Sequence, residues 1–197
     1  MTKIVLATQN QGKVKELKKL LEQTSVQLLS LTDFPHIPEV VEDGLTFREN
    51  AIKKAQQISR ATGLIAIADD SGLEVDFLGG KPGVHSARYA GPQRCDADNN
   101  HKLLNQLANV PQDQRTARFC CVIAVAAPSG VVETADGICP GVIAFAPQGT
   151  GGFGYDPLFY VPEYNCTFAE LSLEIKNKIS HRGKALAQAK GILKAML

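Results

Sequence analysis

The chain has 197 residues, of which 44% are hydrophobic and 21% are charged, and these values are typical of a folded globular protein. The apolar fraction excludes an intrinsically disordered chain, and the net charge of +1 argues against a strongly basic protein that coats nucleic acid or binds a membrane surface. The charges are nevertheless segregated. Residues 1–60 and 174–197 are basic, whereas residues 61–173 carry six basic and twelve acidic side chains, and this pattern is the first indication of function.

The sequence indicates neither a targeting segment nor disulfide bonding. The apolar stretch at residues 4–8 is too short for the core of a signal peptide, and the apolar run at residues 119–128 has about half the length of a membrane helix. The five cysteines form an odd set without C-x-x-C spacing, which argues against a disulfide framework and a structural zinc site. We therefore predict a reduced, cytoplasmic protein that does not bind a membrane.

In chain order, apolar runs alternate with helix-period stretches, which favours an α/β or α+β domain. Residues 3–8 are expected to form a buried strand, and Asn10 then caps a helix with an apolar face. That face consists of Val14, Leu17, Leu20 and Leu21. A second strand is expected at residues 26–31, before a loop imposed by Pro35 and Pro38.

The middle of the chain begins with a capping box, Thr46-x-x-Glu49, which opens a helix that is expected to end near Ala61. Residues 64–69 then form a strand that is expected to run straight into an acidic turn. Glycine and proline residues make residues 79–94 a loop, after which a further helix is expected. Asp98 caps that helix, which carries Leu103, Leu104 and Leu107.

The last third of the chain is expected to hold three strands and two helical regions. The strands span residues 118–126, 131–138 and 158–161, and the helical regions begin at Thr167-x-x-Glu170 and at Gly183. Pro128-Ser129-Gly130 joins the first two of these strands as a hairpin. No internal repeat or linker divides the chain.

The first segment with chemical character is Thr8-Gln9-Asn10-Gln11-Gly12-Lys13, which lies where a buried strand gives way to a helix. The N–H groups and the positive dipole end of a helix attract an anion, and Lys13 adds a mobile positive charge. The segment does not have the spacing of a Walker loop. The alternative is an ordinary helix cap with a solvated lysine.

The second segment is Asp69-Asp70-Ser71-Gly72, which follows an apolar strand. Ionised carboxylates at the edge of a core are costly unless they are paired or bind a cation, and Mg²⁺ prefers one or two carboxylates together with phosphate and water. A strand-ending turn is the alternative. The acidic turn Glu42-Asp43-Gly44 is a candidate for a second carboxylate.

Two further segments lie near the C-terminal end of the chain. Residues 149–154 match G-x-G-x-x-G, but Pro147 precedes them and Pro157 follows, so we reject a dinucleotide-binding turn. Phe153 in this loop is a candidate to lie beside a nucleobase. The segment 176–183 gathers three cations and His181, and it suits a phosphate or a base edge unless it is simply a solvated helix end.

Six motifs follow one another over nearly the whole chain. They are Thr8-x-Asn10-x-x-Lys13, Phe47-x-Glu49-Asn50-Ala51-x-x-Lys54-Ala55, Ala68-Asp69-Asp70-Ser71-Gly72-Leu73, Pro82-Gly83-x-x-Ser86-Ala87-Arg88-Tyr89, Gly151-Gly152-Phe153-Gly154-Tyr155-Asp156-Pro157 and Ser180-His181-Arg182-Gly183. Each motif is weak alone, but the ordered set resembles the inosine/xanthosine triphosphate pyrophosphatase family.

The resemblance implies an α/β fold with two lobes, in which an elongated mixed β-sheet is flanked by helices and a nucleotide cleft lies between the lobes. A single nucleoside triphosphate pyrophosphatase domain would then span residues 1–197. The resemblance also implies a homodimer that uses Mg²⁺ to hydrolyse ITP, dITP and XTP to the monophosphate and pyrophosphate, which clears these deaminated purine nucleotides from the nucleotide pool. No nucleic acid polymer is expected as a partner.

The resemblance also assigns roles to individual residues. The triphosphate grip comprises Thr8, Gln9, Asn10, Gln11, Gly12, Lys13 and Lys54. The base and sugar pocket comprises Phe153, Gly154, Tyr155, Asp156, Lys176, His181 and Arg182. Asp70 is the proton acceptor and a metal ligand, Ser71 contacts the substrate, and Glu42 is a further metal ligand. The sequence leaves open whether Asp69 or Asp70 activates water.

Two positions depart from common family forms. Gln9 stands where glycine or histidine is frequent, and Cys139 stands where an aromatic residue is frequent, which bears on packing or the dimer contact rather than the chemistry. Two other functions stay open at this point. One is a regulatory module that binds a nucleotide without turnover, and the other is a phosphatase or maf-like pyrophosphatase acting on pyrimidine or modified nucleotides.

Overall fold

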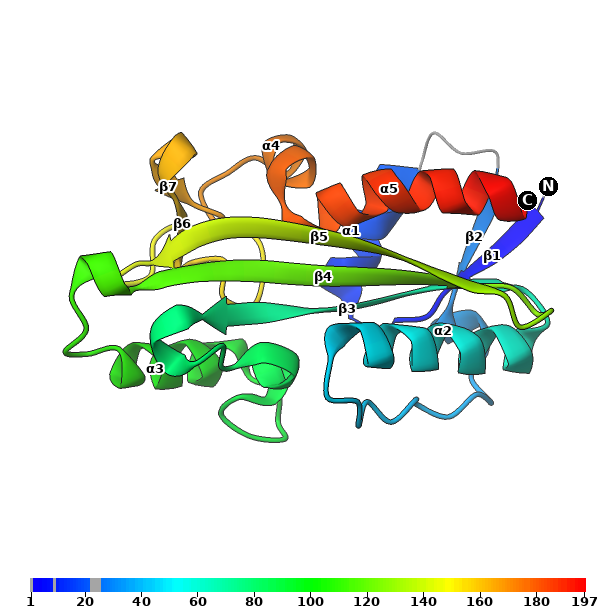
Figure 1. Ribbon diagram of the computed structural model, residues 1–197, viewed down its shortest axis with the longest axis horizontal. Coiled ribbons are helices and arrows are strands. Elements are labelled where there is room, and N and C mark those ends of the chain that lie inside the picture. The colour runs from blue at the N-terminus through cyan, green and yellow to red at the C-terminus, as the bar shows by residue number, and fades with distance from the viewer. Residues whose placement is uncertain (1, 9, 22–25) are drawn as a thin grey trace. The chain divides into compact units, whose positions relative to one another are not determined.

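The computed structural model describes residues 2–8, 10–21 and 26–197 (Figure 1). The strands are β1 Thr2–Leu6, β2 Val26–Ser30, β3 Ile65–Val75, β4 Thr116–Ala126, β5 Val132–Ile143, β6 Phe159–Val161 and β7 Cys166–Thr167. The helices are α1 Gln11–Leu21, α2 Phe47–Thr62, α3 Asp96–Gln106, α4 Leu173–Ile179 and α5 His181–Met196. None of these helices is long and apolar enough to span a bilayer.

In the described residues the strands form one seven-stranded sheet in the order β2-β1-β3-β4-β5-β6-β7. Strand β1 pairs in parallel with β2 and β3, whereas β6 pairs antiparallel with β5 and β7. The sheet is therefore mixed, which confirms the predicted α/β class. By contacts the chain divides into two compact units, residues 1–70, 121–137 and 182–197 in the first and residues 71–120 and 138–181 in the second.

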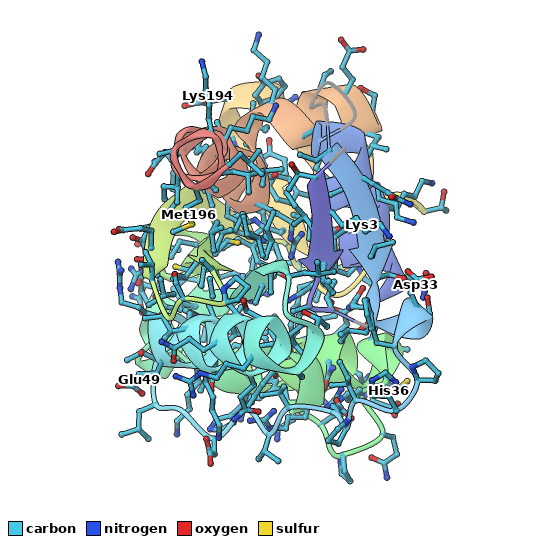
Figure 2. The ribbon with its side chains drawn as sticks, turned by 90° about the vertical axis from the view of Figure 1, so that its right-hand side faces the viewer. Lys3, Asp33, His36, Glu49, Lys194 and Met196 are labelled. Carbon is cyan, nitrogen blue, oxygen red and sulfur yellow. The ribbon has the colours of Figure 1, made fainter. Side chains whose placement is uncertain are left out.

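The first unit packs α1 and α5 against its strands around one apolar core. That core contains Ile4, Leu6, Leu17, Ile67, Cys121, Ile123, Val125, Ala135, Ala185, Leu186, Ala189 and Leu193. Helix α2 lies across the strands from α5, as Figure 2 shows by the labels Glu49 on α2 and Met196 on α5. Two of the predicted caps are confirmed, since Asn10 Oδ1 accepts from the N–H of Lys13 at 3.1 Å and Thr46 Oγ1 accepts from the N–H of Glu49 at 3.1 Å.

The second unit has its own core, in which three aromatic rings pack together. The Phe119 ring lies 4.6 Å from that of Phe159 and 5.7 Å from that of Phe168, measured between centroids. Arg115, only 1% exposed, donates from its guanidinium to backbone carbonyls, among them that of Ile143 at 2.8 Å. Because these carbonyls are buried, the guanidinium satisfies acceptors that water cannot reach.

Three sequence predictions are wrong. Asp98 does not cap its helix, because α3 begins at Asp96, the N-cap residue is Cys95, and Asp98 lies in the first turn. Strand β3 does not end in an acidic turn, because Asp69 and Asp70 lie inside a strand that continues to Val75. Their side chains are paired with groups from other elements, which offsets the cost of burial and lets the strand continue. Thr167-x-x-Glu170 does not open a helix: the Thr167 N–H donates to Glu170 Oε2 at 2.7 Å within a turn, and α4 begins only at residue 173.

Candidate active site

The predicted anion-binding segment lies at the N-terminal end of α1, in the first unit. Thr8 Oγ1 accepts from the N–H of Asn10 at 3.2 Å, and the Asn10 side chain caps the helix. Gln11, Gly12 and Lys13 then form its first turn. The positive end of the helix dipole and the Lys13 ammonium therefore lie together, as an anion site requires. Gln9 lies outside the described residues.

A buried network of charges lies behind this segment. Lys13 Nζ lies 3.0 Å from Asp69 Oδ2, and Arg182 Nε donates to the same oxygen at 3.2 Å. Arg182 also donates to the carboxylate of Glu16. Burial opposes ionisation of Asp69, but the charges of Lys13 and Arg182 outweigh it and hold the pKa of Asp69 well below its usual value. Asp69 is thus ionised and engaged by two cations.

Asp70, the next residue, has the opposite character. Its side chain is buried, and Asp70 Oδ2 accepts from Asn50 Nδ2 at 3.1 Å. Burial raises the pKa of Asp70 above its usual value; Lys13 and Lys54 oppose this shift, and the nearby Glu42 carboxylate adds to it. Two neighbouring carboxylates with opposite pKa shifts are a pattern of acid–base sites, because each environment selects one role. These opposite shifts are the reason that Asp70, rather than Asp69, is taken as the base in the function proposed below.

Glu42 and Lys54 form an ion pair beside Asp70. Lys54 Nζ lies 2.5 Å from Glu42 Oε1. Burial would lower the pKa of Lys54, but the carboxylates of Asp69, Glu42 and Asp70 raise it, so the ammonium stays charged. Burial would likewise raise the pKa of Glu42, but Lys54 lowers it. A lysine that is nearly buried and kept charged is suited to a phosphate.

The donor set at Asp70 fits Mg²⁺ in its chemistry. Within the described part of the chain, no group of three or more acidic, histidine or cysteine side chains is arranged to hold a metal ion. Mg²⁺ does not require such a cage, because it is commonly held by one or two carboxylates and by substrate phosphates and water. Asp70 and Glu42 interact unfavourably as two carboxylates, and a divalent cation would relieve that repulsion.

Except for Arg182, the residues predicted to form the base pocket lie in the second unit, several of them on the glycine loop, residues 151–156. Asp156 Oδ2 accepts from the N–H of Phe153 at 2.8 Å and from Lys176 Nζ at 2.6 Å. Lys176 Nζ also lies 4.9 Å from the centroid of the Phe153 ring. Gly152 has φ +74°, and a Cβ there would meet Asp156 Oδ2 at 2.0 Å, so only glycine fits.

The other predicted residues of this unit are Ser71, Tyr155 and His181. Ser71 is half-buried on β3 and follows Asp70 directly. Tyr155 is buried, and its hydroxyl donates to the carbonyl of Ser86 at 2.8 Å. The His181 ring stacks on that of Phe119 at a centroid distance of 4.7 Å and an interplanar angle of 12°. The last two side chains are therefore part of the packed interior of the second unit.

Sequence reasoning missed two residues of the first unit that hold the candidate site. Glu16 lies three residues after Lys13, on a helix with several charged residues, and nothing in that pattern distinguishes it from a solvated side chain. Asn50 belongs to a motif that was recognised, but its contact with Asp70 is visible only once α2 is placed beside β3. Arg182, assigned to the base pocket from the resemblance, contacts Asp69 and Glu16; its role toward a base stays a prediction.

We expect Asp70 to make the metal-free protein less stable as the pH rises. The folded-state pKa of Asp70 lies above the ordinary value of 3.8, so the native state keeps a proton that the unfolded state has released. Asp70 makes its whole contribution to the free energy of unfolding at pH values below its ordinary pKa. That contribution is lost as the pH rises through the folded-state pKa. In EDTA, the Tm of the wild type relative to Asp70→Asn should therefore fall as the pH rises above about 4 and through the folded-state pKa of Asp70.

Asp98→Asn is the control for this pH series, because Asp98 is an exposed carboxylate. Its Tm should follow that of the wild type at every pH. A difference between the wild type and Asp70→Asn that does not change with pH would contradict the raised pKa.

Comparisons with known proteins show the family and the fold of this chain. The Ham1 family model matches residues 4–192. A dITP/XTP pyrophosphatase of Desulforamulus reducens is 61% identical over 191 residues, which cover 97% of this chain and 95% of that protein. The structure of a HAM1 protein from Coxiella burnetii superposes with a TM-score of 0.90 at 44% identity, covering 99% of this chain and 100% of the other.

A second solved structure, the Ham1 protein of Staphylococcus aureus, covers 100% of both chains with a TM-score of 0.88 and 41% identity. The matches thus extend over both units, with the mixed sheet and the segments that hold the candidate site. This chain belongs to the Ham1 family.

Proposed function

We infer that this protein hydrolyses the deaminated purine nucleoside triphosphates dITP, ITP and XTP to the nucleoside monophosphate and pyrophosphate, and so removes them from the nucleotide pool. Relatives named dITP/XTP pyrophosphatase that match nearly the full chain support this substrate class. The observation that carries the chemistry is Asp70, a buried carboxylate with a raised pKa beside two lysines, Lys13 and Lys54.

The triphosphate is bound in this proposal by the first unit. The N-terminal end of α1 offers N–H groups and a positive dipole, and Lys13 and Lys54 supply ammonium groups for the phosphate oxygens. Glu42 and Asp70 are the residues that would hold Mg²⁺, which when bound neutralises charge that develops on the phosphoryl oxygens. Asp69 keeps Lys13 in place through its 3.0 Å ion pair.

The reaction is an in-line attack of water on the α-phosphorus. Asp70 orients the water and accepts its proton as the new bond from oxygen to the α-phosphorus forms. The bond from the α-phosphorus to the bridging oxygen breaks, and pyrophosphate leaves with the electron pair. Positioned charges carry most of the catalysis, because phosphoryl transfer needs no covalent enzyme intermediate.

The base and ribose are bound by the second unit. Phe153 offers a ring for stacking on the purine, and Lys176 and Asp156 fix the loop that carries it. A hydrogen-bond donor that faces position 6 of the purine would bind the 6-oxo group of hypoxanthine and xanthine. The same donor would be left unpaired against the 6-amino group of adenine. Ser71 and His181 complete the proposed substrate contacts. The homodimer and the cytoplasmic location stay part of this proposal.

A substrate panel tests the function. We expect kcat/KM for ITP, dITP and XTP to exceed that for ATP by about 10²-fold or more, with one pyrophosphate released per turnover in the presence of Mg²⁺. Pyrophosphate and orthophosphate are measured separately for the same set of nucleotides. Equal values for ATP and ITP would contradict the base selection, and a preference for pyrimidine triphosphates would favour a maf-like activity. Binding without any pyrophosphate release would indicate a regulatory module.

A further inference from the structure

Two side chains of helix α3 form hydrogen bonds to one residue of the glycine loop, Gly154. The N–H of Gly154 donates to Asp96 Oδ2 at 2.7 Å, and Asn100 Nδ2 donates to the Gly154 carbonyl at 2.9 Å. Asp96 and Asn100 are four residues apart on the helix and therefore lie on the same face, one above the other. The two side chains together grip both backbone polar groups of Gly154, and we call this pair of contacts the α3 clamp.

The α3 clamp adds to the contacts that hold the loop: the Phe153 carbonyl accepts from the N–H of Asp156 at 3.3 Å, and the clamp binds the N–H and the carbonyl of Gly154. Gly154 has φ +64°, a left-handed conformation that few other residues adopt. Asp156 is held through Lys176, and Tyr155 through the carbonyl of Ser86. The clamp acts on the peptide groups on both sides of Gly154, and one of these belongs to Phe153, the aromatic residue proposed to stack on the base.

Asn100 gives a second indication that the clamp serves the loop. Its Oδ1 atom is buried and has no hydrogen-bond partner among the described residues. A buried amide oxygen without a donor costs free energy, so the local packing of Asn100 does not by itself favour an asparagine. Among the described residues, the Asn100 side chain makes its hydrogen bond from Nδ2 to the Gly154 carbonyl. The contact that this asparagine makes is therefore the one that positions the loop.

We propose that Asp96 and Asn100 are positioning residues that preorganise Phe153 for the purine base, an inference that rests on the function proposed above. Without the clamp, the N–H and the carbonyl of Gly154 lose their partners on α3, so this part of the loop is held less firmly and must be ordered further when a nucleotide binds. Ordering a loop on binding lowers the affinity without changing the reacting groups. The clamp thus acts on recognition of the nucleoside, whereas Asp70 and the lysines of the first unit act on the triphosphate.

Single substitutions on α3 test this proposal. In Asp96→Ala and Asn100→Ala we expect KM for ITP and Kd for IMP to rise about three- to tenfold, the effect of losing one hydrogen bond. The kcat should stay within about twofold of the wild type, because the lost interaction stabilises the bound substrate and the transition state equally. The inhibition constant of pyrophosphate should not change, since pyrophosphate lacks a base.

Matched controls lie on the same helix. Asp98→Ala also removes an acidic side chain from the first turn of α3, and Asn105→Ala removes an exposed asparagine; neither should alter KM. Asp96→Asn keeps an oxygen that can accept from Gly154 and should restore most of the affinity for IMP. Asn100→Asp replaces the donor by a carboxylate facing the Gly154 carbonyl and should weaken IMP binding more than Asn100→Ala.

Several results would overturn the proposed role of the α3 clamp. Unchanged KM and IMP affinity in both alanine variants would do so, and so would an equal loss of pyrophosphate affinity, which indicates a general structural defect. The Tm is measured for each variant, and if Asp96→Ala does not fold, Asn100→Ala and Asn100→Asp decide the question. A wild-type protein that releases no pyrophosphate from ITP contradicts the proposed function, whereas an active wild type with unaffected variants contradicts only the clamp.

Discussion

Replacing Asp70 with asparagine is expected to lower kcat for ITP by about 10²–10⁴-fold, the range for the loss of a general base. The substitution removes the proposed proton acceptor and one of the two proposed metal ligands while keeping the shape of the side chain. The amide oxygen can still accept from Asn50, which donates to Asp70 at 3.1 Å in the wild type, so the fold should be retained. Pyrophosphate release at saturating ITP and Mg²⁺ measures the effect.

Asp43→Asn is the matched control for this experiment. Asp43 belongs to the same acidic turn as Glu42, but it is exposed and pairs with Lys53. Its replacement should leave kcat within about twofold of the wild type, as is usual for a surface carboxylate. Wild-type turnover by Asp70→Asn would show that Asp70 is neither the base nor a required ligand.

Replacing Arg182 with methionine is expected to lower the free energy of unfolding by about 3–5 kcal/mol, the cost of removing one partner from a buried ion pair. The side chains of Arg182, Asp69 and Glu16 are 3%, 0% and 6% exposed. Without the guanidinium, the two buried carboxylates of Glu16 and Asp69 would lose the cation that they share, and Lys13 and Lys54 would compensate the charge of Asp69 only in part. Urea unfolding at neutral pH measures the loss.

The exposed pair formed by Arg48 and Asp136 provides the comparison, because it lies in the same unit and its nitrogen and oxygen are 2.6 Å apart. Arg48→Met should cost no more than about 1 kcal/mol, since solvent screens a surface pair. Equal losses in the two methionine variants would contradict the claim that burial gives the Arg182 network its importance. The double variant Glu16→Gln/Arg182→Met should recover part of the stability lost by Arg182→Met alone.

The parts of the fold that depend on neighbouring residues could be predicted from the sequence. Asn10 and Thr46 cap the helices that follow them, and the chain turns at Gly130 between β4 and β5, because each signal acts over a few residues. The path of β3 could not be predicted in this way. A pair of adjacent aspartates is normally a sign of a turn, and here it lies inside a strand.

The reason is that the partners of Asp69 come from distant parts of the chain. Arg182 is 113 residues away from Asp69 in sequence, and Lys13 lies in the first helix. The segregation of charge along the sequence has its explanation here, since the basic segments at both ends supply cations to an aspartate of the acidic middle. The roles of individual site residues came from the resemblance to a family rather than from local pattern.

One measurement tests the central claim most directly. The protein is incubated with equal concentrations of ITP and ATP and with Mg²⁺ in water enriched in oxygen-18. The products are then separated, and the oxygen-18 content of each is measured by mass spectrometry. Attack on the α-phosphorus predicts IMP that carries the label, unlabelled pyrophosphate, and ATP that is nearly unchanged. Labelled orthophosphate with IDP, label in the pyrophosphate, or AMP formed as fast as IMP would contradict the account.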